Sequence, residues 1–453
     1  MSAAGSGARE VAAGAAPLTA PEAALLLDAS FAGNEHVVLA VSGGADSTAL
    51  MVLAAEWRAA RAVARPALSV VTVDHGLRPE SAAEAAAVAL RAHDLGLEHT
   101  TLAWPGPKPA TGIQAAARDA RYRLIGAHLA ANRWPAVATA HTEDDQAETL
   151  LLRLARGSGI DGLAAMRPKS RREGMLVLRP LLGIPKARLV ATLEARGLRW
   201  LEDPSNARLD FERVRLRAAR TALDGIGLTS AHLALSARRL ARASVSVAAA
   251  VMTAVGAPEA AVLVSPLGHA EVGWSWLIEQ PPEVRLRILA GLLRAIGGRA
   301  EPISLGQLEA MTEGRDWANP AGRTFAGVAF VAGADDAVVM VREAGRQGLP
   351  ELVLAAGPEA LWDSRFAVSY AWSDEQPLTI RSLGPTGASE ALAGRRPEWQ
   401  RDRPPRRALE ALPGFWHGGR LLAAPGLDYV AAAAPISGAT ARFIGKPFGD
   451  IAL

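Results

Sequence analysis

Apolar and polar residues alternate with two different spacings along the first half of the chain. Short apolar, β-branched runs predict strands at 37–41, 68–73, 99–104 and 136–140. Between them, apolar residues recur every three or four positions, which predicts helices at 48–61, 80–93, 112–132 and 144–156. Strands and helices in this order predict an α/β fold with a parallel sheet, in which ligands bind at the carboxyl ends of the strands.

The pattern changes twice after residue 220. Segments rich in Ala, Leu and Arg at 230–255 and 282–296 predict helices, and from about residue 324 short apolar runs predict strands, beginning with a hairpin of 324–331 and 337–341. We therefore expect four parts: a flexible N-terminal tail over 1–30, the α/β domain over 31–220, a helical domain over 221–320 and a small α+β domain over 321–453.

Composition excludes several kinds of chemistry. The 453 residues include no cysteine, which excludes disulfides, thiolate catalysis, iron–sulfur clusters and cysteine-bound zinc. The net charge of +3 permits a nucleic-acid partner without requiring one. The N-terminus does not have the pattern of a signal peptide, and the apolar run 245–255 is too short to cross a bilayer and predicts a core helix. We expect a soluble cytoplasmic protein with no membrane partner.

The first strand ends abruptly in the run Ser-Gly-Gly-Ala-Asp-Ser at 42–47, and a helix follows. Gly43 and Gly44 allow backbone angles that other residues avoid, and the free N–H groups of the helix N-terminus attract phosphate. Ser42 and Ser47 add hydroxyl donors, whereas Asp46 can only accept and therefore suits a magnesium ion. The loop lacks the Gly-Lys-Ser/Thr of a Walker A motif and the spacing of a dinucleotide fingerprint.

Polar residues gather after the later strands as well. Asp74, in Asp-His-Gly-Leu-Arg, ends the second strand, where it either reaches a nucleotide or caps the following turn. Arg118 and Arg121 share one helical face, which suits phosphate or RNA and equally suits a solvated surface. Gly157, in a Gly-rich loop, either ends a helix or brings backbone amides to a nucleotide.

The run 140–149 is dense in acids. One helical face carries a histidine and three carboxylates, at His141, Asp144, Asp145 and Glu148. Acids packed after a buried strand are costly unless a cation neutralises them, so this face predicts a site for magnesium or for a substrate ammonium. The alternative is a set of acids that the helix dipole stabilises.

Taken in order, these motifs resemble the bacterial tRNA(Ile)-lysidine synthetase family of the ATP-pyrophosphatase (PP-loop) superfamily. The matching runs span about 36–220 and read SGGADS, VDHGLR, GIQAAARDARY, AHTEDDQAET, RGSGIDGL, RPLL and EDPSN with ERVRLR. Two positions depart from the family pattern: Thr142 replaces a second histidine, and Val214 replaces an asparagine. The first departure weakens any role for a histidine pair, and the second retains the positive charge of the run.

The resemblance implies a Rossmann-like PP-loop ATPase domain followed by helical and C-terminal domains that hold tRNA. It implies that ATP adenylates the wobble cytidine of tRNA(Ile) with a CAU anticodon, that free L-lysine displaces AMP, and that Mg²⁺ assists. The implied ATP-binding residues are Ser42, Gly43, Gly44, Ala45, Asp46, Ser47, Asp74, His141 and Gly157. The implied catalytic residues are Asp46, Arg118, Asp144, Asp145 and Glu148, with Asp46 and Asp145 as metal ligands.

Three alternatives stay open at this point. A tRNA thiolase normally relies on cysteines, which this chain lacks. An ammonia-dependent GMP or NAD synthetase would need a partner subunit to supply ammonia. A non-catalytic tRNA- or nucleotide-binding protein would keep its function without Asp46. The sequence excludes neither a monomer nor a homodimer.

Overall fold

A computed structural model describes residues 14–60, 66–109, 111–202, 212–298, 303–313, 320–357, 359–372, 377–393 and 404–448. The chain divides into two compact units, Met1–Ser244 and Val245–Leu453. The elements that begin in the first unit are α2 (Ala20–Phe31), β1 (His36–Ala40), α3 (Ala45–Ala59), β2 (Ala67–Asp74), α4 (Ser81–Asp94), β3 (Glu98–Ala103), α5 (Ile113–Asn132), β4 (Ala136–Ala138), α6 (Glu143–Ala155), α7 (Ile160–Leu163), β5 (Lys169–Arg172), β6 (Met175–Leu178), α8 (Lys186–Glu194), α9 (Glu212–Ala218), α10 (Arg220–Gly225) and α11 (Ser230–Gly256).

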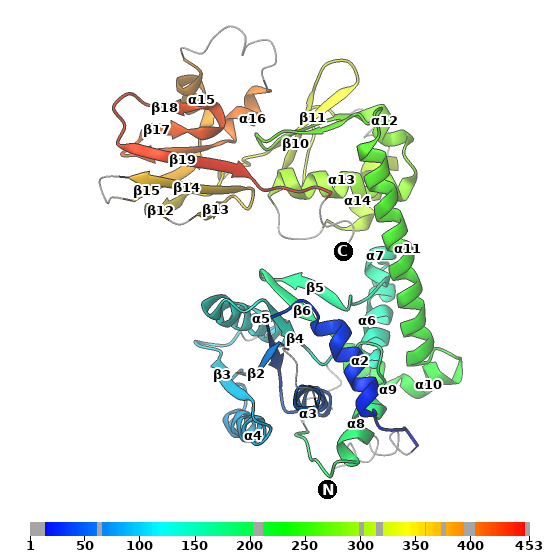
Figure 1. Cartoon of the computed structure of the whole chain (residues 1–453). Coiled ribbons are helices and arrows are strands. Elements are labelled where there is room, and N and C mark those ends of the chain that lie inside the picture. The colour runs from blue at the N-terminus through cyan, green and yellow to red at the C-terminus, as the bar shows by residue number, and fades with distance from the viewer. Residues whose placement is uncertain are drawn as a thin grey trace. The chain divides into compact units, whose positions relative to one another are not determined.

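A six-stranded sheet in the order β3-β2-β1-β4-β6-β5 forms the centre of the first unit. The pairs among β3, β2, β1, β4 and β6 are parallel, as the alternating pattern predicts, and only the edge strand β5 is antiparallel. Helices α3 and α4 lie on one side of the sheet and α5 on the other (Figure 1). Leu39 of β1 therefore packs toward α3, and Val38 packs toward α5. Because both faces are covered, β1 is apolar throughout its middle.

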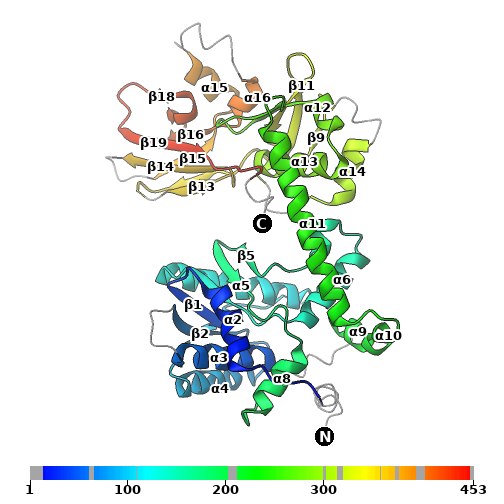
Figure 2. The ribbon, with the colours of Figure 1, turned by 45° about the vertical axis from the view of Figure 1, so that its right-hand side comes forward.

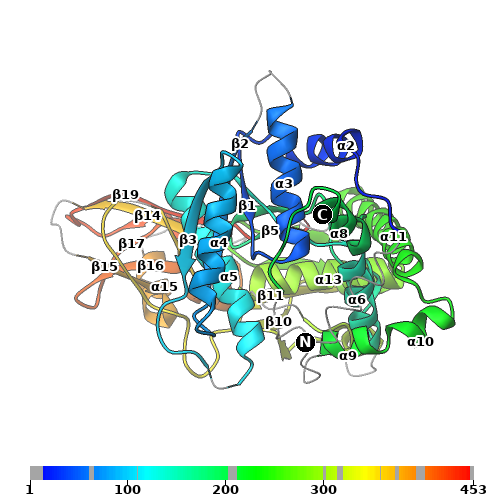
Figure 3. The same ribbon diagram turned by 90° about the horizontal axis from the view of Figure 1, so that it is seen from below.

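The expected N-terminal tail is partly structured. Residues 20–31 form helix α2, which begins with a capping box between Thr19 and Glu22 and lies beside α3 (Figure 3). Leu27 and Phe31 are each 1% exposed in the core of the sheet. The Ala-rich sequence did not predict this helix, because α2 is stabilised by its packing on α3 more than by an amphipathic pattern of its own.

The described residues of the second unit form three antiparallel sheets. Its elements are β7 (Val262–Val264), β8 (Ala270–Gly273), α12 (Trp274–Glu279), α13 (Pro282–Gly297), α14 (Leu305–Glu313), β9 (Thr324–Phe325), β10 (Val328–Ala332), β11 (Ala337–Arg342), β12 (Leu352–Leu354), β13 (Ala360–Trp362), β14 (Phe366–Trp372), β15 (Leu378–Ser382), α15 (Gly384–Leu392), α16 (Arg406–Glu410), β16 (Pro413–His417), β17 (Arg420–Ala424), η4 (Pro425–Leu427), β18 (Tyr429–Val430) and β19 (Ile436–Phe443). Their orders are β7-β8-β11-β10-β9, β12-β15-β16-β17-β18 and β13-β14-β19.

The hairpin expected near residue 330 is confirmed as β10 and β11. The expected domain boundary at residue 320, however, falls inside a sheet, because β11 pairs with β8 and places Val338 opposite Val272. Strand pairing between distant segments leaves no trace in local periodicity, so the sequence separated elements that share one core.

A buried ion cluster lies in the second unit. Asp363, whose side chain is 3% exposed, accepts hydrogen bonds from Arg342 and Arg365. Arg365 also donates to the backbone carbonyls of Gly268 and Ala411. These bonds join the loop between β7 and β8 to the segment before β16, and two guanidiniums share one carboxylate.

Helix α11 is continuous over 27 residues (Figure 2). Among the described residues, α11 is the one helix that is long and apolar enough to cross a membrane, by length and composition alone. Only 17% of its most apolar 18-residue window is buried. The run 245–255 is helical as expected, but just one of its faces is covered: Val251 is 0% exposed and Met252 is 47% exposed. Ser244, 1% exposed, donates to Asp161 and accepts from Arg167, which ties the helix to the first unit.

Candidate active site

The turn between β1 and α3 is held by its own hydroxyl groups. Ser47 Oγ accepts from the Ser42 N–H at 3.2 Å, lies 3.2 Å from Ser42 Oγ, and donates to the Gly44 carbonyl at 3.1 Å. Thr48 donates to the Gly43 carbonyl at 3.1 Å. Gly44 is the N-cap of α3 and offers no side chain to the first turn of the helix. The N–H groups of that turn are therefore left for an anion.

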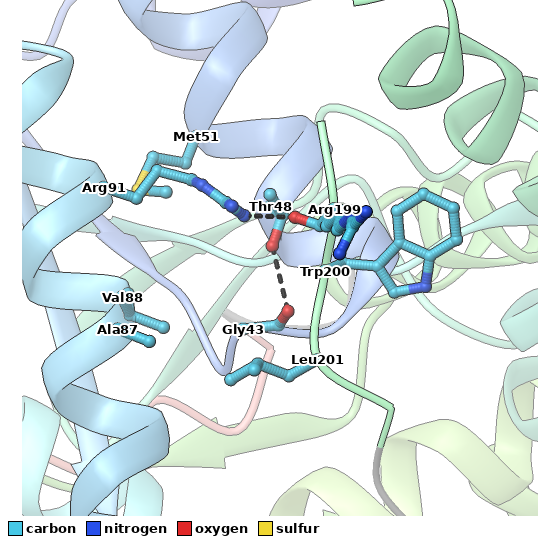
Figure 4. Close-up of a pocket in the computed structure, with 9 residues that line it drawn as sticks. All are labelled: Gly43, Thr48, Met51, Ala87, Val88, Arg91, Arg199, Trp200 and Leu201. Carbon is cyan, nitrogen blue, oxygen red and sulfur yellow. Dashed lines mark hydrogen bonds between the residues drawn. The ribbon is translucent and has the colours of Figure 1, made fainter. Parts of the chain in front are cut away.

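Gly43 has no room for a side chain. Its φ of 87° is in the left-handed region, and a Cβ would lie 2.5 Å from Leu201 Cδ1 and 3.2 Å from Val88 Cγ2. The Leu201 N–H also donates to the Gly43 carbonyl at 2.9 Å. Figure 4 shows the Leu201 side chain beside Gly43. A small cavity of about 90 Å³ is lined by these two residues together with Arg91 and Met51. The segment 199–201 thus supports the loop from behind.

Asp144, Asp145 and Glu148 lie on α6 as the sequence predicts, but His141 does not share their helical face, because α6 begins at Glu143. The three acids have different partners. Asp145 is part of a capping box: its Oδ2 accepts from the N–H and hydroxyl of Thr142 at 2.8 and 3.0 Å. Asp144 accepts from the Lys186 N–H through Oδ2 and from Ser230 Oγ through Oδ1, each at 2.8 Å. Asp144 therefore joins α6 to the starts of α8 and α11.

Glu148 is paired with an arginine. Its side chain is 8% exposed, and Arg217 donates to its two oxygens at 2.6 and 3.2 Å. Burial lowers the pKa of Arg217. The hydrogen bond to Glu148 and the negative charges of Asp145 and Asp46 raise it by more, so the pKa of Arg217 lies above its usual value. These four groups therefore share one site, at the carboxyl ends of β1 and β4.

Asp46 lies on the loop side of this site. Burial raises its pKa to about 6, the charges of Asp145 and Asp144 raise it as well, and Lys186 opposes them. Lys186 Nζ is 3.5 Å from Asp46 Oδ2. Asp46 Oδ1 is buried without a hydrogen-bond partner in the described part of the chain. A buried carboxylate oxygen with no partner is costly, and a bound cation would compensate that cost.

Arg118 lies in a second, positively charged cluster. It is 5.5 Å from the ring centre of Tyr122, and Arg172 is 4.1 Å from the same ring. Burial lowers the pKa of Arg179 nearby, and the charges of Arg118 and Arg172 lower it further. Arginines held this close to one another suit a phosphate or an RNA backbone.

Asp74 has the geometry of a turn residue. Its pKa is lowered, chiefly by the Ser81 hydroxyl and then by the Gly76 N–H, which donates to Oδ1 at 2.8 Å. The neighbouring His75 is largely neutral because burial lowers its pKa to about 4, with Arg121 Nη2 3.4 Å from its Nε2. The capping role of Asp74 is thus visible in the structure.

The two remaining predicted residues lie at opposite ends of α6. His141 precedes the helix, and its Nδ1 is 2.9 Å from Thr139 Oγ1. Gly157 follows the helix with a φ of 66°, and its N–H donates to the Leu154 carbonyl, as at a helix C-terminus. The 13 residues of α6 hold these ends about 20 Å apart. Residues 203–206 of the Glu-Asp-Pro-Ser-Asn run lie outside the described residues.

Two cations of the site were not among the predicted site residues. Lys186 follows the Arg-Pro-Leu-Leu run, and its signal is a lysine at the start of a helix that follows a buried strand. Arg217 belongs to the arginine run at 213–217, which the sequence explains equally well as a solvated helix face or as a site for RNA phosphate, whereas the structure pairs it with Glu148.

Residues 19–221 match the family model of the PP-loop domain. The tRNA(Ile)-lysidine synthase of Bradyrhizobium sp. (strain BTAi1 / ATCC BAA-1182) is 47% identical over 321 residues, which cover 69% of this chain and 86% of that protein. The synthase of Ruegeria pomeroyi is 37% identical over 399 residues, which cover 85% and 87%. That of Rhodopseudomonas palustris is 60% identical over 182 residues, which cover 40% and 52%.

The PP-loop match includes the phosphate loop, the acidic face and the arginine cluster, so an ATP-binding role for this domain agrees with the geometry of the loop. The two longest of these alignments extend well beyond the PP-loop domain into the second unit. This chain belongs to the tRNA(Ile)-lysidine synthase family.

Proposed function

We propose that this protein is a ligase that joins L-lysine to carbon 2 of the wobble cytidine in tRNA(Ile) with a CAU anticodon. The carbon-2 oxygen attacks the α-phosphate of ATP and pyrophosphate leaves. The ε-amine of free lysine then attacks carbon 2, AMP leaves, and the amine loses a proton. The observation that carries this proposal is the buried acidic cluster directly beside a phosphate-binding loop, in a chain that belongs to this family.

The loop residues Ser42 to Ser47 would hold the phosphates of ATP. The N–H groups at the start of α3 lack side-chain caps, and the helix dipole adds positive potential where the leaving pyrophosphate gains charge. The turn is already ordered by its hydroxyl groups, so little rearrangement is needed when the nucleotide binds. Asp74, His141 and Gly157 would contribute around the nucleotide less directly, because each has a local structural partner.

Mg²⁺ fits the residues present. Asp46 and Asp145 would hold it, since Asp46 Oδ1 is buried and without a partner in the described part of the chain. Where residues are described, no three acidic or histidine side chains gather into a metal site on their own. The remaining ligands would be phosphate oxygens and water, as is usual for Mg²⁺. The ion would neutralise the charge that gathers on the phosphates.

The acids of α6 would divide the remaining work. Glu148 would bind an ammonium group of lysine, and the bonds of Asp144 to α8 and α11 make it the acid that shapes this pocket. Arg118 and its arginine neighbours would contact a phosphate of ATP or of the tRNA. We place this reaction in the cytoplasm.

The decisive experiment is ATP-dependent transfer of radiolabelled lysine to a tRNA(Ile) transcript with a CAU anticodon, with a transcript that carries uridine at the wobble position as the control. We expect label on the first transcript only. No label on either, with folded protein and intact ATP, would contradict the proposal and favour ammonia-dependent adenylation. If Asp46→Ala left both tRNA affinity and cellular function intact, a non-catalytic binding protein would be favoured, whereas an enzyme should lose turnover and keep much of its tRNA binding.

A further inference from the structure

A second cation besides Arg217 reaches the acidic cluster. Lys186 is the first residue of α8, and its ammonium nitrogen lies 3.5 Å from Asp46 Oδ2. In the described part of the chain Asp46 is the one ionic partner of this ammonium, and the lysine side chain is 48% exposed. Its position beside the phosphate loop brings a mobile positive charge to the place where the phosphates of ATP would bind.

The backbone of Lys186 is fixed independently of its side chain. The Lys186 N–H donates to Asp144 Oδ2 at 2.8 Å, which ties the start of α8 to α6. Any residue except proline keeps this bond. The origin of the side chain is therefore constant, and the ammonium can move within the reach of its four-carbon stem.

The charges of the cluster favour such a movement. Arg217 is committed to Glu148 through two bonds, whereas Lys186 has a single, longer contact with Asp46. A divalent cation at Asp46 would repel the ammonium from its position. The phosphates that arrive with the cation are negative, and lysine binds phosphate as a compact point charge with three donors.

We propose that Lys186 is a phosphate-contacting residue of the ATP site, whose ammonium neutralises Asp46 in the free enzyme and transfers to the phosphates when Mg²⁺ and ATP bind. This inference rests on the proposed function for the identity of the nucleotide. It assigns Lys186 two successive partners: an aspartate before binding and a phosphate oxygen after it. The same exchange explains how Asp46 stays balanced in the free enzyme and still becomes available to the metal ion.

The exchange makes two opposite predictions for Lys186→Met in the full-length protein. Loss of the phosphate contact should weaken binding of a non-hydrolysable ATP analogue with Mg²⁺ about tenfold, as a lost charge-assisted bond does. Loss of the competing ammonium should tighten binding of Mn²⁺ alone several-fold. A purely structural role would weaken both, so the pair of measurements separates the two explanations.

The test uses calorimetry for the nucleotide analogue and the electron paramagnetic resonance of free Mn²⁺ for the metal. Lys169→Met, in the exposed part of β5, is the matched control for loss of one positive charge and should change neither affinity. Lys186→Arg keeps the charge and should retain most of the affinity for the analogue. If Lys186→Met is poorly folded, Lys186→Gln provides the same two measurements.

The inference is overturned if Lys186→Met binds the analogue as tightly as wild type, or if Mn²⁺ alone binds no more tightly. Both measurements omit tRNA and lysine. Failure of lysine transfer in the wild type would therefore refute the proposed function and leave the result on Lys186 intact.

Discussion

Gly43→Ala is expected to disturb the phosphate loop through a clash that a second substitution can relieve. The added Cβ meets two obstacles. The backbone has a φ of 87°, which side chains rarely tolerate, and Leu201 Cδ1 would lie only 2.5 Å away. The backbone strain depends on residue 43 alone, whereas the steric clash depends on residues 43 and 201 together. Leu201→Ala removes the 2.5 Å contact and leaves the backbone conformation and a looser 3.2 Å contact with Val88 Cγ2.

The two contributions can be given separate magnitudes. A left-handed backbone costs a non-glycine residue about 1–2 kcal/mol, and overpacking costs about 1–3 kcal/mol. Gly43→Ala should therefore destabilise the first unit by about 2–5 kcal/mol. Leu201 is only half-buried, so Leu201→Ala should cost about 1–2 kcal/mol, less than for a full core leucine. The double variant should lack the overpacking cost, which gives a favourable coupling of about 1–3 kcal/mol.

The assay is urea unfolding of the four proteins in this cycle, with hydrogen exchange over residues 37–60 to assign the transition to the first unit. Gly33→Ala is the matched control, because Gly33 has a φ of 77° with open space around its Cβ. It should cost only the backbone contribution, and Leu201→Ala should not rescue it. Costs at Gly43 and Leu201 that add within about 0.4 kcal/mol would refute the steric argument.

Three further predictions concern buried charges. Burial raises the pKa of Asp46 to about 6 in the folded protein, so its ionised form destabilises the fold above pH 6. Asp46→Asn should therefore stabilise the metal-free protein by up to about 3 kcal/mol above pH 6, and urea unfolding should show this gain disappearing toward pH 4. Arg217→Ala should abolish lysine transfer and destabilise the first unit by about 3–5 kcal/mol, because the buried carboxylate of Glu148 loses both hydrogen bonds from Arg217. Combining it with Glu148→Gln should restore stability but not activity, and an equally unstable double variant would contradict the pairing. Asp363→Ala should destabilise the second unit by about 3–5 kcal/mol, since two guanidiniums lose the carboxylate that they share. Amide hydrogen exchange over residues 360–370 at the same rate as in the wild type would contradict this prediction.

Much of the first unit could be predicted from local sequence. The strands at β1, β2, β3 and β4 and the helices between them follow the expected spacing within a few residues, because buried parallel strands and amphipathic helices carry strong local periodicity. The sequence alone also identified the turn between β1 and α3 and the acids of α6 as candidate site residues. Each lies within one continuous segment, where spacing fixes which side chains share a face.

Only the tertiary structure decided how these acids differ. Asp144, Asp145 and Glu148 are equivalent in the sequence pattern, yet one joins two other helices, one caps its own helix and one pairs with Arg217. Partners that come from distant segments, such as Lys186 and Leu201, are placed by packing that local spacing does not encode.

The same reason explains α2 and the sheet that joins β8 to β11. The first is a helix whose stability comes from its neighbours, and the second is a pairing between segments far apart in the chain. The sequence by itself therefore determined most of the alternating strands and helices of the first unit and the two segments that carry the candidate site. The packing of distant segments decided which carboxylate has an oxygen without a partner and which cation balances it, since burial and hydrogen bonding depend on the whole fold.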